Sequence, residues 1–167
     1  MKKIEYRYID KSKWITDPID EFLSEPDKVQ YMDEETGMPC LIVRGPSGAL
    51  CGYVGVPESH PLFGKDYDEL YNYENEKGVS IDVHGGLTFA DKCHPREGGL
   101  GICHAPDKGE SDNVWWFGFD CAHCGDLVPA YDSIHRGGIY RTIAYVENQI
   151  KYLARQLNAV TTPPLGG

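Results

Sequence analysis

The stretch IYRTIAYVENQIKYLARQL, Ile139–Leu157, decides the fold class of this chain. Its apolar residues recur at alternating steps of four and three, at Ile139, Ile143, Val146, Ile150, Leu153 and Leu157. This period is typical of an amphipathic helix whose apolar stripe packs on a larger apolar surface. The sequence therefore predicts one long helix over residues 139–158.

Three stretches indicate the sheet that this helix would cover. PCLIVRGPSGALCGYVGVP, Pro39–Pro57, has two apolar runs around the turn signal RGPSG and predicts a β-hairpin. VSIDVHGG, Val79–Gly86, alternates apolar and polar residues, and VWWFGFD, Val114–Asp120, is an apolar run. We expect an α+β fold, a mostly antiparallel sheet packed against one long C-terminal amphipathic helix.

Length and composition are those of a single globular domain. The chain has 167 residues, of which 41% are hydrophobic and 25% charged, which is enough to bury a core. We expect one domain over residues 1–167, divided into a peripheral N-terminal segment (1–38), the sheet with its site loops (39–135) and the helix (139–158).

The net charge of −10 restricts the partners. A nucleic-acid backbone needs many Lys and Arg residues on one face, so a long nucleic acid is not expected, whereas a small anionic ligand is. No apolar stretch is long enough for a transmembrane helix, and the N-terminus lacks the apolar region of a signal peptide. The expected location is the cytosol, where the six cysteines would be reduced rather than paired.

Histidine and aspartate residues lie at the ends of the two later predicted strands. One runs into His84, and the other runs into Asp120, His123 and Asp126. If the strands are neighbours, these four side chains meet at one edge of the sheet. Imidazole and carboxylate groups together can carry general acid–base catalysis, so we predict these four as the catalytic set. A thiol from Cys124 or Cys121 beside His123 is less suited to be a nucleophile, because adjacent residues rarely face each other.

The same region contains residue types that bind metals. CAHC, Cys121–Cys124, has the spacing of two zinc-binding thiolates, but a structural zinc site needs a second such pair, and Cys93 and Cys103 are ten residues apart. A divalent metal such as zinc fits better on a mixed set. The predicted ligands of that set are His84, His104, His123 and Asp126.

Aromatic and basic residues near these polar segments suggest a pocket for a flat, negatively charged ligand. Tyr53, Trp115 and Trp116 could stack on a base, and Lys65 and Arg136 could contact phosphate. Gly85 and Gly86 leave the backbone bare for close approach of a ligand. Trp115 and Trp116 must point to opposite faces of their strand, so at least one is expected in the core.

Several motifs resemble an uncharacterised family of small proteins from bacteriophages and mobile elements. The motifs are VHGGLTF, GICHAPDKGESDNVWWFGFDCAHCGDLVP and YRTIAYVENQIKYLARQL, and the resemblance covers Leu41 to Leu157. The matching positions are His84, Gly85, Gly86, Thr88, Cys103, His104, Trp116, Asp120, Cys121, His123, Gly125 and Asp126. The resemblance adds Thr88 to the ligand-binding set. The family often has a small residue in place of Cys124, which disfavours a CxxC zinc site.

Three functions agree with these patterns. The first is a phage-type hydrolase of a small phosphorylated, nucleotide-like molecule, such as a host immune signal, because small phage proteins with a compact polar pocket often counter host defence. The second is a binding protein that sequesters such a ligand without chemistry. The third is a protein–protein inhibitor acting through its acidic surface, with Asp33, Glu34 and Glu35 as its contact residues.

Overall fold

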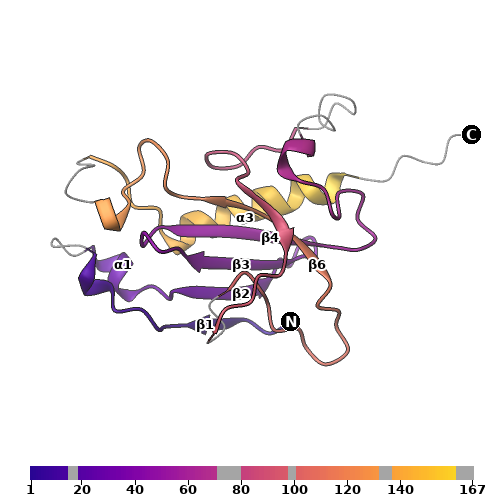
Figure 1. Cartoon of the computed structure of the whole chain (residues 1–167), viewed down its shortest axis with the longest axis horizontal. Helices are drawn as coiled ribbons and strands as arrows, with labels where there is room; N and C mark the ends of the chain where they lie inside the picture. Colours follow the sequence, from indigo (N-terminus) through magenta and orange to yellow (C-terminus); the bar gives the residue numbers. More distant parts are fainter. Residues whose placement is uncertain (15–18, 71–79, 98–100, 132–136, 161–167) are drawn as a thin grey trace, which may run out of the picture.

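The fold is a six-stranded antiparallel sheet with a long helix on one face (Figure 1), as the sequence predicts. The computed structural model describes residues 1–14, 19–70, 80–97, 101–131 and 137–160. The strand order is β1-β2-β3-β4-β6-β5, and every neighbouring pair is antiparallel. The strands are β1 (Ile4–Tyr6), β2 (Lys28–Met32), β3 (Pro39–Arg44), β4 (Leu50–Pro57), β5 (Phe89–Lys92) and β6 (Val114–Asp120). The helices are α1 (Asp20–Ser24) and α3 (Ile143–Ala159), with 3-10 turns at Lys11–Lys13 and Pro129–Tyr131.

The predicted hairpin is present as β3 and β4. Their register pairs Cys40 with Val54 and Arg44 with Leu50. The turn between them closes with a hydrogen bond from the Gly45 N–H to the Ala49 carbonyl. Gly48 in this turn has φ +86°, a conformation that glycine adopts without strain.

Helix α3 carries the predicted apolar stripe but begins at Ile143 rather than at residue 139. Thr142 is its N-cap, with the side chain accepting from the Tyr145 N–H. Ile139 is 59% exposed and lies outside the helix. The remaining stripe is fully buried against the sheet, at Val146, Ile150, Leu153 and Leu157. The capping threonine therefore fixes the start of the helix, and the apolar period alone overestimated its length.

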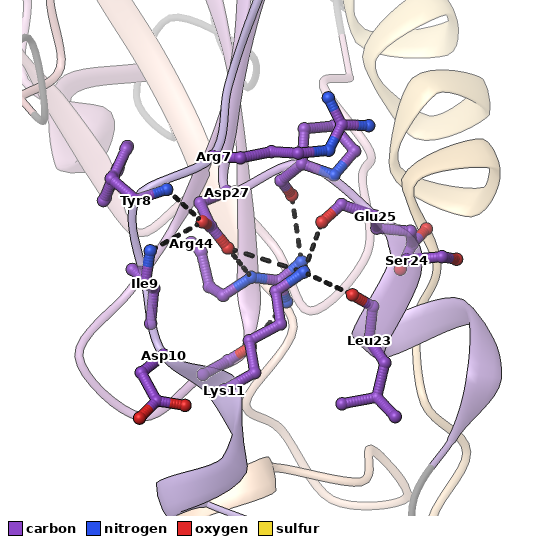
Figure 2. Close-up of polar contacts among 12 residues, drawn as sticks. Arg7, Tyr8, Ile9, Asp10, Lys11, Leu23, Ser24, Glu25, Asp27 and Arg44 are labelled. Carbon is purple, nitrogen blue, oxygen red and sulfur yellow. Dashed lines mark hydrogen bonds and ion pairs between the residues drawn. The ribbon is translucent and has the colours of Figure 1, made fainter.

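The first 38 residues are not peripheral, because they supply β1 and β2 to the sheet. A buried polar cluster also ties them to the hairpin (Figure 2). Asp27 accepts the backbone N–H groups of Tyr8 and Ile9 and pairs with Arg44 Nε at 3.1 Å. Lys11 Nζ lies 3.6 Å from the same carboxylate. Each charge in this buried cluster has partners, as burial requires.

A second link from this segment reaches helix α3. The Glu25 carboxylate accepts the Ile143 N–H at the first turn of the helix and the Tyr140 hydroxyl at 3.0 Å. Arg44 donates to the same hydroxyl at 2.9 Å. An acidic group at a helix N-terminus is favourable, because it satisfies free N–H groups and complements the helix dipole.

The sheet face opposite α3 is covered by the long segment that follows β5. Lys28 Nζ donates to the carbonyls of Gly101 and Cys103 at 2.7 and 2.8 Å. Gln30 exchanges two hydrogen bonds with the backbone of Ala105. Alternation along β6 separates the two faces: Trp115, on the side of α3, packs against the larger core, and Trp116 lies in the smaller core opposite.

The predicted strand at 79–86 is absent from the described part of this segment, which begins at residue 80. Residues 80–83 run beside α3, and glutamine side chains of the helix replace a neighbouring strand. The side-chain amide of Gln156 accepts a hydrogen bond from the Asp82 N–H at 2.6 Å and donates one to the Asp82 carbonyl at 2.7 Å. Val83 is still buried, at 5% exposure. The alternating pattern therefore arises because one side of this extended segment is buried, although the segment does not pair with a strand of the sheet.

Candidate functional site

The four residues predicted as catalytic do come together, at the end of the sheet where β6 stops. Asp120 is the last residue of β6, and His123 and Asp126 lie in the turn that follows it. His84 is in a turn between the extended segment beside α3 and strand β5. His84 is therefore not at a strand end, but the polar edge that the sequence predicts exists.

His84 is held on three sides. Its Nε2 lies 2.7 Å from Asp126 Oδ2, and its Nδ1 lies 2.7 Å from the Tyr145 hydroxyl. Its backbone N–H donates to the Gln149 side chain at 2.9 Å. A carboxylate on one ring nitrogen and a hydroxyl on the other fix the orientation of the imidazole, the same division of roles as in a hydroxyl–His–Asp triad.

Asp126 is the buried centre of the site, at 3% exposure. Its Oδ1 accepts from Arg141 Nε at 2.8 Å, and its Oδ2 accepts the backbone N–H of His123 at 3.0 Å. Burial raises the pKa of this carboxyl, but the hydrogen bonds from Arg141 and His84 outweigh burial and lower the pKa below its ordinary value. The hydrogen bond to Asp126 in turn raises the pKa of Arg141. Asp126 is therefore held as a carboxylate.

His123 lies beside His84, with ring centroids 5.9 Å apart. Its Nε2 is 3.2 Å from Asp120 Oδ1, but this buried nitrogen has no aligned hydrogen-bond partner. Asp120 is anchored by the Thr88 hydroxyl at 3.0 Å and by the Ala122 N–H at 3.1 Å. Each imidazole thus has its own carboxylate, and the one-third exposed part of the His123 ring, on the side of Nδ1, can exchange a proton with a ligand.

A cavity of 580 Å³ adjoins this cluster and includes His123 and Asp126 in its lining. Its other walls are Cys124, Gly125 and Tyr131 among others. The volume suits a small molecule. His123 can therefore be reached from solvent through this cavity.

The predicted ligand-binding residues that the structure describes divide into three groups. Gly85, Gly86 and Thr88 belong to the cluster or adjoin it. Tyr53 and Trp116 lie in the core on the face away from α3. Trp115 packs on the α3 side and donates its Nε1–H to the Lys65 carbonyl at 3.0 Å. Arg136 lies outside the described residues.

The predicted metal set is not assembled. His104 lies away from the other three ligands, packed edge-on against Trp116 at 5.5 Å, beside a separate cavity of 1170 Å³. Burial lowers the pKa of His104. Within the described ranges, no three His, Cys, Asp or Glu side chains are placed to hold a metal ion. The sequence could not show this, because the loop that carries His104 crosses the opposite sheet face.

The cysteines also differ from expectation. Cys93 and Cys103 form a disulfide, although the composition predicted reduced thiols. In the CxxC motif, Cys121 is buried in the main core and burial raises the pKa of its thiol, whereas Cys124 is exposed. The two thiols therefore face different environments.

The acidic residues of the inhibitor hypothesis are partly engaged within the fold. Asp33 is buried and accepts the N–H and hydroxyl of Thr36 at 2.9 and 2.6 Å. Glu35 pairs with Arg155 through both carboxylate oxygens. This surface offers less free negative charge than its sequence suggests.

Sequence reasoning missed Arg141, Tyr145 and Gln149, which complete the site. Tyr145 and Gln149 are four residues apart and lie on one face of α3, and Arg141 comes four residues earlier, just before the N-cap of the helix. Arg141 also stacks over the Tyr145 ring at 4.6 Å. The signal was therefore a polar stripe beside the apolar one.

Comparison with known proteins does not identify a family for this chain. No family model matches the chain, and neither a curated protein nor a solved structure matches it. Among the described residues, no helix has the length and apolar character needed to cross a membrane.

Proposed function

We propose that this protein is a hydrolase of a small phosphorylated, nucleotide-like molecule, with His84 and His123 as its acid–base pair. The observation that carries the proposal is the pair of imidazoles 5.9 Å apart, each with its own carboxylate. Hydrolysis of a phosphoester needs one group to take a proton from water and another to give a proton to the leaving oxygen. Two histidines in different surroundings can divide these tasks.

In this proposal His123 is the base. Nδ1 of its one-third exposed side chain takes a proton from water. The water oxygen bonds to phosphorus, and the bond from phosphorus to the leaving oxygen breaks. The leaving oxygen takes the Tyr145 hydroxyl proton, and Nδ1 of the His84 imidazolium replaces that proton. Asp126 balances the imidazolium charge of His84 before transfer.

Arg141 supplies the positive charge that a phosphoryl group requires. Its Nε is fixed on Asp126, and its guanidinium lies over the Tyr145 ring. The remaining N–H groups can donate to phosphoryl oxygens beside the proposed leaving oxygen. The charge of Arg141 is local, which is compatible with an acidic chain overall.

The test uses two chromogenic probes, 4-nitrophenyl phosphate and bis(4-nitrophenyl) phosphate, with release of 4-nitrophenolate as the readout. His84→Ala and His123→Ala should each lower kcat by roughly a hundredfold or more, with circular dichroism unchanged. His104→Ala is the matched control, because this half-buried histidine lies outside the cluster, and it should keep the wild-type rate. No turnover of either probe by the wild type, or full activity in both cluster variants, would overturn the proposal.

Sequestration without hydrolysis is the second candidate. It is favoured by one observation: both ring nitrogens of His84 already have partners within the protein. A nucleotide recovered intact from the heat-denatured complex would support sequestration, whereas recovered fragments support hydrolysis.

A further inference from the structure

A second cavity, of 730 Å³, lies on the sheet face away from α3. Its floor includes Tyr53 of β4 and Phe89 of β5. One part of the wall comes from the N-terminal segment through Tyr8 and Trp14, and another part comes from the disulfide-bonded loop through Arg96. The cavity is separate from the one that His123 and Asp126 line, and its volume suits a small organic ligand.

Aromatic rings dominate two sides of this cavity. Tyr53 and Phe89 meet edge to face on the floor, with centroids 5.4 Å apart and ring planes at 87°. Tyr8 is 38% exposed, so part of its side chain is open to a ligand. Aromatic walls of this kind favour a flat ring, which can pack face-on or edge-on against them.

Arg96 brings a positive charge to the cavity. Burial raises the pKa of the Tyr8 and Tyr53 hydroxyls, and the positive charge of Arg96 opposes this rise at both. The guanidinium therefore lies within electrostatic reach of both hydroxyls. Among the described residues, no hydrogen bond or ion pair engages Arg96.

The other charged groups in the lining are already engaged. Arg44 is paired with Asp27, and the Asp10 carboxylate accepts the N–H and hydroxyl of Ser12 at 3.1 and 2.6 Å. His94 Nε2 lies 2.7 Å from Asp91. The Asp10 carboxylate keeps its negative charge but has its hydrogen bonds within the fold. Arg96 is thus the charged group of the lining whose N–H donors remain for a ligand, and these donors favour an anion.

We propose that this cavity binds a planar aromatic ring that carries an anionic phosphate or carboxylate group. The ring packs among Tyr8, Tyr53 and Phe89, and the anionic group pairs with Arg96. This site does not depend on the proposed hydrolysis, because none of the histidines of the cluster lines it.

The test is isothermal titration of the full chain with adenosine 5′-monophosphate, adenosine and ribose 5-phosphate. The monophosphate should bind at least about tenfold more tightly than either fragment. Arg96→Glu should abolish this preference, because it replaces the positive charge that pairs with the phosphate by a negative one. The side chain is exposed, so the substitution should leave the core intact. Arg7→Glu is the matched control, since Arg7 is exposed on the same N-terminal segment, does not line this cavity and should leave binding unchanged.

The histidine cluster supplies the decisive comparison. In His123→Ala, binding of the monophosphate should persist, which places the ligand away from the proposed catalytic centre. Loss of binding in His123→Ala with retention in Arg96→Glu would overturn the inference and leave the proposed hydrolysis standing. Equal binding of adenosine and its monophosphate, or no binding of the monophosphate, would overturn it as well.

Discussion

The imidazole of His123 rests against the α-carbon of Gly85. A Cβ built on Gly85 would lie 2.2 Å from Cδ2 of His123 and 2.3 Å from its Nε2. Gly85 also has φ +67°, a conformation that other residues adopt at a cost. The glycine after His84 therefore determines where the second histidine sits, and this contact links the two halves of the site.

Gly85→Ala should displace His123 and remove activity to the extent that His123→Ala does. We expect a loss in the free energy of unfolding of about 2–4 kcal/mol, from backbone strain and from the clash. Urea unfolding and the NMR resonances of the His123 ring provide the measurements.

Gly86→Ala is the matched control for this prediction. Gly86 has φ +80°, but a Cβ added to it would meet no other atom within 4 Å. It should lose only the strain contribution of about 1–2 kcal/mol and keep the His123 resonances in place. Similar spectra and activity for the two variants would contradict the role of Gly85.

The sequence predicted those parts of the fold that have a regular apolar pattern. Helix α3 has a 3.6-residue period, and β3, β4 and β6 are long apolar runs. Strand β2 was missed because its polar residues Lys28 and Gln30 are buried and break the expected apolar pattern. Their side chains form hydrogen bonds with backbone groups about 75 residues away along the chain. Such partners are not visible in a local pattern. Strands β1 and β5 have only three and four residues, too few for a clear alternation.

The site, like the fold, was predictable only where a local sequence pattern pointed to it. His84 and the carboxylates after β6 were found because glycines and polar residues follow apolar segments. Arg141 and Tyr145 were missed because the start of the predicted helix, residues 139–158, was expected only to pack on the sheet; Tyr145 is in the first turn of α3, and Arg141 lies just before it. His104 was misplaced because no pattern shows which sheet face a long loop crosses.

Asp126→Asn should lower the free energy of unfolding by about 1–3 kcal/mol at neutral pH, because charge-assisted hydrogen bonds from Arg141 and His84 are weakened. The folded-state pKa of Asp126 is lowered, so its stabilisation is present above the unfolded pKa of about 3.9 and is lost as the pH falls through the folded value. The stability difference between wild type and variant should therefore shrink below about pH 4. Urea unfolding from pH 7 to pH 3 measures it.

Asp91→Asn is the control for the charge at Asp126. Asp91 lies at the same 2.7 Å from a histidine, His94, but this pair is exposed. Solvent screening should keep its effect below about 1 kcal/mol. A deficit in Asp126→Asn that is equally large at pH 3 would show that packing, and not the carboxylate charge, is responsible.

The disulfide should stabilise the loop that crosses the sheet. Cys93→Ser combined with Cys103→Ser should lower the free energy of unfolding by about 3 kcal/mol, the value expected for a closed loop of this length. Cys124→Ser removes an exposed thiol and should have no measurable effect. In denaturant without reductant, four thiols should titrate, those of Cys40, Cys51, Cys121 and Cys124. Titration of six would show that the disulfide is absent.

Lys28 should give stability a distinct alkaline pH dependence. Burial lowers the pKa of its amine to about 8, below the unfolded value of about 10.4. Between these values the unfolded chain binds more protons, so the contribution of Lys28 to stability rises with pH. Buried Cys and Tyr groups with raised pKa values act in the opposite sense, so the difference between wild type and Lys28→Met is the quantity to measure.

This difference should grow in favour of the wild type from pH 8 to pH 10, by an amount on the order of 2 kcal/mol. Urea unfolding at each pH gives the values. Lys92→Met makes the same substitution at an exposed lysine and should show no such trend, because water solvates that amine in the folded and the unfolded chain alike. The two carbonyls of Gly101 and Cys103 can still accept from a neutral amine, so deprotonation removes the cost of a buried charge and keeps both hydrogen bonds. A flat difference across this range would mean that Lys28 is solvated in the folded state and that the loop does not seal this face of the sheet.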